Sequence, residues 1–162
     1  MAGVAPPRRT RVLAVALAVL GAVLAGCGTV VPGRAVADPV PAADRALVDA
    51  YVDAVNRAGD AGTDAQTAFL RSTQEPGVPF PPARCFGTVA VHTRLVERTL
   101  RPAPTWTVPG PDGRDRRPDG AVYVVAASVT ATRDGTAVRE DVGSKHLVVR
   151  RGRVYGYAPC PS

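Results

Sequence analysis

The chain has 162 residues, which is enough for one domain with a single hydrophobic core. It holds 20 lysine and arginine residues against 14 aspartate and glutamate residues, a net charge of +6 at pH 7. An excess of this size is compatible with an anionic membrane surface and does not call for a nucleic acid partner.

The N-terminus has the pattern of an export signal. A basic stretch over residues 1–11 precedes an apolar run, Val12–Leu24. As a helix this run would measure roughly 20 Å, short of the ~30 Å hydrocarbon core of a membrane. It is therefore typical of a secretory signal and not of a permanent transmembrane helix.

The sequence Leu24-Ala25-Gly26-Cys27, which closes the apolar run, resembles the lipobox of bacterial lipoproteins. The resemblance implies that residues 1–26 are a signal peptide cleaved between Gly26 and Cys27. It also implies that the Cys27 sulfur carries a diacylglycerol with fatty acids such as palmitate. The mature chain would then be anchored by lipid in the cell membrane and face outside the cytoplasm.

Processing changes the charge of the chain. Arg8, Arg9 and Arg11 leave with the signal peptide, so that 17 basic and 14 acidic residues remain, a net charge of +3. Together with export, this smaller excess argues further against nucleic acid as a partner. The Arg8-Arg9 pair allows twin-arginine export, but Thr10 and Arg11 displace the expected hydrophobic residues and favour general secretion.

Three cysteines are an odd count for an exported protein. If Cys27 is lipidated, Cys85 and Cys160 remain for a disulfide, which an oxidising compartment permits. Such a bridge would close a loop of about 76 residues and stabilise the fold by at most roughly 4–5 kcal/mol in the chain-entropy model. The alternative, a redox pair, lacks any C-x-x-C spacing.

A tether and two helices are expected next. Residues 27–43, with Gly33 and three prolines, have no periodicity and resemble the segment after the lipid cysteine in small actinobacterial lipoproteins. A domain over residues 44–162 follows. Asp44 is expected to cap a helix over 44–58 whose apolar stripe contains Leu47, Val48, Tyr51, Val52 and Val55.

The second helix is expected to begin with a capping box, in which Thr63 caps the helix and Gln66 reaches back to it. It ends at Glu75-Pro76-Gly77. We expect four residues of this helix to point inward, namely Ala65, Ala68, Phe69 and Ser72.

From Phe86 onward the pattern predicts strands. We expect a long strand over 87–100, a short edge strand over 105–108, and two long strands over 121–133 and 136–150 joined by a hairpin turn at Asp134-Gly135. The apolar phase of 136–150 changes midway, which predicts a β-bulge at Gly143. A turn at Arg151-Gly152 leads into a last strand over 154–158.

Helices followed by an antiparallel meander predict an α+β fold, with two N-terminal helices packed on a curved sheet of about four strands. The element order, and the last hairpin over 147–157, resemble the NTF2-like (cystatin-like) cone. That resemblance implies a pocket between the first long helix and the sheet. The residues expected to line it are Tyr51, Val55, Phe69, Trp106 and Tyr123.

No residue pattern calls for catalysis, a metal or a cofactor. His92 and His146, with Glu140 or Asp141, lack the spacing of a metal or acid–base site. An NTF2-like enzyme would need an acid or base near Tyr51, but Asp53 falls on the polar side of the same helix. Two arginine clusters are expected to be solvated loops or contacts to anionic headgroups: Arg114, Arg116 and Arg117, and Arg150, Arg151 and Arg153.

These observations predict a lipid-anchored, extracytoplasmic binding module of the cell envelope, which is not an enzyme and takes a small apolar ligand or an envelope protein as its partner. The alternatives are an NTF2-like enzyme acting on a small apolar substrate and an accessory subunit of an envelope protein complex. An inward acid or base would favour the enzyme, and an exposed apolar patch without a cavity would favour the subunit.

Overall fold

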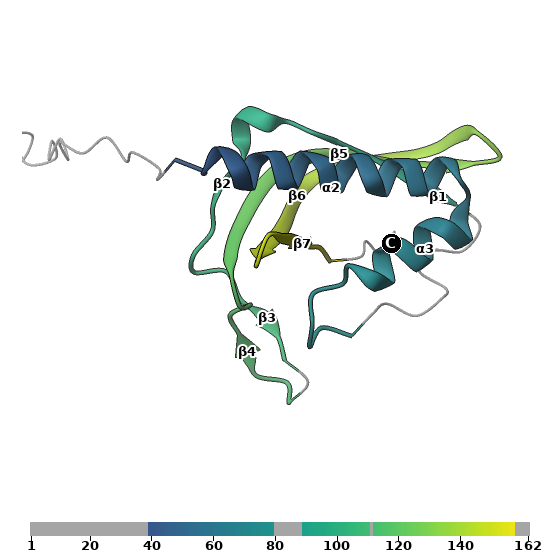
Figure 1. Cartoon of the computed structure of the whole chain (residues 1–162). Helices are drawn as coiled ribbons and strands as arrows, with labels where there is room; N and C mark the ends of the chain where they lie inside the picture. Colours follow the sequence, from purple (N-terminus) through teal and green to yellow (C-terminus); the bar gives the residue numbers. More distant parts are fainter. Residues whose placement is uncertain (1–38, 80–88, 111, 158–162) are drawn as a thin grey trace, which may run out of the picture. The chain divides into compact units, whose positions relative to one another are not determined.

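Two helices lie against a curled antiparallel sheet, which makes the fold α+β as expected (Figure 1). The computed structural model describes residues 39–79, 89–110 and 112–157. The predicted signal peptide lies outside the described residues, as do Cys27, Cys85 and Cys160. No helix within the described ranges has the length and hydropathy needed to cross a membrane.

The first helix, α2, spans Ala42–Asp60 and has the predicted apolar stripe. Its buried residues recur at helical spacing and are Val48, Val52, Val55 and Gly59. The helix begins two residues earlier than expected, so that Ala42 and Ala43 are helical and not part of the tether. Asp44 is therefore not the cap: it lies in the first turn, and its carboxylate accepts a hydrogen bond from the Tyr123 hydroxyl.

The second helix, α3, spans Thr63–Ser72, but the predicted capping box is wrong. Gly62 precedes the helix, and no side chain caps it. The inward side is also rotated from the predicted one, because Gln66 and Leu70 are the buried residues. Ala65, Ala68 and Ser72 are exposed, and Phe69 is half-buried.

The five-stranded sheet has the order β1-β5-β6-β7, and β2 pairs with β5. The bounds are Ala90–Leu95 for β1, Arg101–Pro102 for β2, Ala121–Arg133 for β5, Thr136–Arg150 for β6 and Arg153–Tyr155 for β7. A 3-10 turn, η2 (Glu97–Thr99), separates β1 from β2, so the predicted continuous strand over 87–100 is wrong. A separate two-stranded ribbon pairs β3 (Val108–Pro109) with β4 (Asp115–Arg116).

The β5–β6–β7 meander confirms the predicted hairpins. Asp134 and Gly135 turn the chain with φ of 51° and 75°, and Arg151 and Gly152 do so with 51° and 72°. Positive φ at both central residues matches the twist of the flanking strands. The predicted bulge at Gly143 is wrong, because Gly143 pairs regularly with Ala127.

The register instead shifts near the hairpin, between Ala131 and Thr132 on β5, opposite Val138. The apolar phase change that motivated a central bulge has a simpler cause. Val142 is 81% exposed and lies on the face of the sheet away from the helices, so it need not share a phase with Leu147.

The core lies between α2 and the curled sheet. Its largest buried cluster joins Val48 of α2 to inward residues of β5, β6 and β7: Tyr123, Val125, Leu147, Val149 and Val154, together with Leu100. A smaller cluster joins Val55 to Leu70 of α3. The core is thus divided along α2, and the space between its parts is where the candidate site lies.

Candidate functional site

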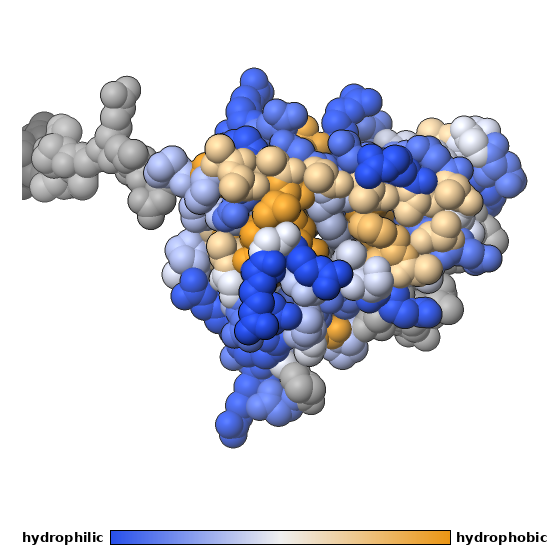
Figure 2. Space-filling model, viewed as in Figure 1, coloured by the Kyte–Doolittle hydropathy of each residue, from blue (hydrophilic) through white to orange (hydrophobic). Residues whose placement is uncertain are grey.

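A cavity of about 300 Å³ lies between the helices and the sheet. Helices α2 and α3 form one wall, and β1 and β6 form another. Figure 2 shows hydrophobic residues gathered along α2 and below it on this face, with hydrophilic residues around them. The apolar and aromatic residues that line the cavity are Tyr51, Val52, Val55, Leu70, Val91, Trp106, Leu147 and Tyr157, and the polar ones are Thr93, Ser144, Lys145 and His146, with Gly156.

The cavity exists because the last strand is short. β7 has three residues and pairs only with Val148–Arg150, so no strand in the described part of the chain continues along β6 toward Ser144. Aromatic side chains occupy that place instead. Trp106 stacks on His146 with ring centroids 4.1 Å apart, and the Tyr157 ring meets Trp106 edge-on at 4.8 Å.

Three of the five residues expected to line the pocket do so: Tyr51, Val55 and Trp106. Phe69 does not line it but packs against the Tyr51 ring at 5.9 Å, because α3 is rotated from the predicted phase. Tyr123 belongs to the buried core near the start of α2, where its hydroxyl donates to Asp44.

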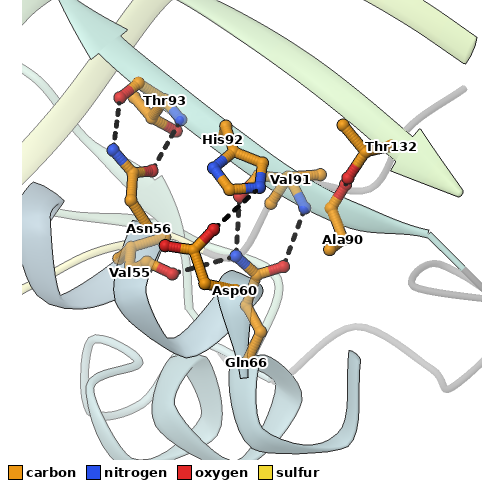
Figure 3. Close-up of polar contacts among 9 residues, drawn as sticks. All are labelled: Val55, Asn56, Asp60, Gln66, Ala90, Val91, His92, Thr93 and Thr132. Carbon is orange, nitrogen blue, oxygen red and sulfur yellow. Dashed lines mark hydrogen bonds and ion pairs between the residues drawn. The ribbon is translucent and has the colours of Figure 1, made fainter. Parts of the chain in front are cut away.

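The wall formed by β1 is held by side-chain amides of the two helices (Figure 3). Gln66 Nε2 donates to the Val91 carbonyl at 2.6 Å, and the Val91 amide donates to Gln66 Oε1 at 2.8 Å. Asn56 forms the same pair of bonds with the backbone of Thr93, at 2.9 and 2.8 Å. Because β1 is the edge of the sheet, these amides take the place of a neighbouring strand.

The opposite wall is fixed by the end of the chain. The Gly156 amide donates to the Thr73 carbonyl at 2.9 Å, and the Glu75 amide donates to the Gly156 carbonyl at 3.0 Å. A Cβ atom on Gly156 would overlap the Tyr51 hydroxyl, so only glycine allows this approach. Burial raises the pKa of Tyr51, and its hydrogen bond with Thr73 offsets part of that rise.

The cavity has one charged group, Lys145, that the sequence pattern did not single out. Lys145 lies opposite Val125 in the β5–β6 register and therefore on the face of the sheet that packs against α2. Burial lowers the pKa of Lys145. Burial, and then the nearby Arg101, lower the pKa of His146. In the sequence, the one signal that Lys145 faces inward is its alternation with Leu147 and Val149 along the strand.

The histidines do not form a shared site. His92 is on β1, and its Nε2 lies 3.7 Å from Asp60. His146 is on a different strand, β6, and stacks on Trp106. In the ranges that the structure describes, no group of three or more histidine, cysteine, aspartate or glutamate residues is arranged to hold a metal ion. Asp53 is exposed and lines a separate, more polar groove, so it does not face the cavity with Tyr51.

Arginines of the two predicted clusters are partly engaged in the fold. Arg116 binds Glu75 at 2.6 Å, and Glu75 is 2% exposed. The Arg150 guanidinium lies 5.0 Å from the centre of the Tyr155 ring and 3.7 Å from Asp119. These arginines therefore hold β4 and β7 in place, in addition to any contact with an anionic surface.

Compared with protein-family models, with curated proteins and with solved structures, the chain matches none of them. Its class is defined by its own architecture. It is an α+β domain with helices on the inner side of a curled antiparallel sheet and an apolar cavity between the two.

Proposed function

We propose that the protein is a lipid-anchored, extracytoplasmic binding module of the cell envelope that holds a small apolar ligand in this cavity. The observation that carries the proposal is the cavity itself. Its volume of about 300 Å³ lies at the lower end of the range of small-molecule sites, and most of its lining is apolar or aromatic with a few polar groups. At roughly 30 Å³ per water-sized group it has room for about ten non-hydrogen atoms.

The location rests on the lipobox resemblance at Leu24–Cys27. The fold is compatible with an NTF2-like cone, since helices lie on the inner side of a curled sheet and a pocket lies between them. The enzyme alternative required an acid or base inside the pocket: Asp53 lies outside it, whereas Lys145 and His146 line it, so this alternative keeps support from these two residues. The accessory-subunit alternative has less support, because a cavity is present.

Ligand binding can be tested with Trp106, the single tryptophan of the chain, as the reporter. Titration with octanol is expected to change its fluorescence in a saturable way. Val55→Phe should abolish this response, because Val55 is 5% exposed and lines the cavity. Val142→Phe makes the same substitution at an 81% exposed position and should leave binding intact. Equal binding by the two variants would refute the proposed site.

The anchor has an independent test. In cells fed a fatty-acid analogue that can be detected chemically, the wild-type protein should take up label and fractionate with the membrane. Cys27→Ala should take up none and leave that fraction. Labelled, membrane-bound Cys27→Ala protein would contradict the lipoprotein assignment without affecting the cavity.

A further inference from the structure

One charged side chain in the cavity lacks a counter-charge. Lys145 is the single lysine of the chain. It forms no hydrogen bond or ion pair with any residue that the structure describes. Lys145 is half-buried, and partial withdrawal of an ammonium group from water without a partner is disfavoured, which agrees with the direction of its pKa change. A bound anion would remove this cost.

Tyr157 also lines the cavity, and its hydroxyl is buried without a partner. Within the described residues, the Tyr157 hydroxyl is the one buried side-chain polar atom without a hydrogen-bond partner. Burial, with a smaller contribution from the charge of Glu75, raises the pKa of Tyr157, so its hydroxyl remains a donor at neutral pH. A buried donor without an acceptor is rare in folded proteins, and an ordered water or a ligand would supply the acceptor.

The charges around the cavity favour an anion as that acceptor. Glu75, the carboxylate close enough to influence Tyr157, is neutralised by Arg116 at 2.6 Å. No carboxylate is among the described residues that line the cavity. Lys145 is therefore left as an unbalanced positive group beside apolar walls.

We propose that the ligand is an apolar molecule of about ten non-hydrogen atoms that ends in a carboxylate, and that Lys145 and Tyr157 bind this head group. The inference rests on the proposed function, since it names the chemical class of the ligand in the same cavity. The ammonium of Lys145 supplies the counter-charge and the hydroxyl of Tyr157 donates a hydrogen bond, while Val52, Val55 and Leu70 contact the chain of the ligand.

Three probes of one chain length test this class in the full-length protein: octanoate, octanol and octylammonium, each titrated against Trp106 fluorescence. Octanoate should bind at least about tenfold more tightly than octanol, as expected for a hydrogen-bonded charge, and octylammonium should bind most weakly. Equal affinities for octanoate and octanol, or tightest binding of octylammonium, would overturn the assignment of a carboxylate. If no probe binds at all, the proposed function itself fails.

Variants identify the head-group contacts. Lys145→Met should reduce octanoate affinity about tenfold or more while octanol binds as before, and Lys145→Arg should restore much of the preference. Arg133→Met, which removes a positive charge from an exposed position outside the cavity, is the matched control and should change neither affinity.

Tyr157→Phe should weaken octanoate several-fold without lowering the melting temperature, because it removes an unsatisfied buried group. An unchanged octanoate preference in both Lys145→Met and Tyr157→Phe would overturn the proposal. A melting curve of each variant establishes that it is folded under the conditions of the titration.

Discussion

At the scale of single residues, the most informative side chains are the two amides that close the edge of β1. An edge strand presents unpaired backbone groups, which favour pairing with other chains. Gln66 and Asn56 satisfy the donor and the acceptor of Val91 and of Thr93. Because Val91 and Thr93 also line the cavity, the same bonds protect the edge and set the shape of the site.

Gly59 makes room for this arrangement, and its substitution is the first prediction. A Cβ on Gly59 would lie 2.6 Å from Gln66 Nε2, and three hydrogen bonds hold the Gln66 side-chain amide in place, two from Nε2 and one to Oε1. Glycine to alanine inside a helix ordinarily stabilises by about 1 kcal/mol. Here Gly59→Ala should instead lower the free energy of unfolding by about 1–2 kcal/mol, because the site is overpacked.

A double-mutant cycle isolates the cause. Gln66→Ala alone should destabilise by about 2–4 kcal/mol, since it leaves backbone groups of Val91 unpaired. In that background the nearest remaining atom to the new Cβ is the Val91 carbonyl oxygen at 3.4 Å, an ordinary contact. Gly59→Ala should then stabilise by about 0.5–1 kcal/mol. Additive effects in urea unfolding would show that the two residues do not interact.

At the scale of elements, the β3–β4 ribbon is attached to the segment after α3 by one buried ion pair. Arg116 of β4 binds the Glu75 carboxylate and the Pro76 carbonyl, each at 2.6 Å. Glu75 is 2% exposed, and Arg116 supplies the counter-charge for its carboxylate. The position of Glu75 also matters for the cavity, because its backbone is bonded to Gly156.

Removing one partner of the Arg116–Glu75 ion pair should therefore lower the free energy of unfolding more than removing both. Arg116→Met leaves a buried carboxylate unpaired and is expected to lower the free energy of unfolding by about 3–5 kcal/mol. Combining it with Glu75→Gln should recover most of that loss, as measured by urea unfolding. Arg117→Met, at the exposed neighbouring position, is the control and should change stability by less than about 0.5 kcal/mol. A double variant as unstable as Arg116→Met would contradict this account.

Sequence reasoning correctly predicted the elements whose local residue pattern agrees with their surroundings in the folded protein. The stripe of α2 and the Asp134-Gly135 turn are of this kind, because spacing and backbone conformation are local properties. It failed at α3, where Gln66 and Thr63 match a capping box while the Gln66 amide bonds to a strand 25 residues away. Local propensity carries no information about a contact between residues so far apart in the sequence.

The candidate site was predictable to a similar extent. The apolar lining from α2 followed from its stripe, and Trp106 was expected as lining of the pocket that the NTF2-like resemblance implied. Lys145 was not predicted, because lysine is ordinarily exposed and only the strand register places it inward. Tyr157 was not predicted either, since its importance depends on the absence of a partner for its hydroxyl in three dimensions.

At the scale of the whole molecule, α2 is joined to the sheet at its N-terminal end by the Tyr123–Asp44 hydrogen bond. Tyr123 is 4% exposed. Burial, followed by the hydrogen bond and the charge of Asp44, raises the pKa of Tyr123 to about 12. The core therefore holds a phenol that can ionise only at a cost in free energy.

This predicts a loss of stability at alkaline pH whose sign follows from proton binding. In the unfolded chain tyrosine titrates near pH 10, so between about pH 10 and pH 12 the folded state holds more protons than the unfolded state. The contribution of Tyr123 is thus complete below pH 10 and declines as the pH rises toward 12. Urea unfolding across this interval should show a falling free energy of unfolding, and Tyr123→Phe should reduce the slope.

Part of the slope should remain, because burial also raises the pKa of Tyr51 and Tyr157. Asp44→Asn removes the charge beside the phenol and should reduce the slope by a smaller amount, so an unchanged slope in both variants would exclude this pair as its source.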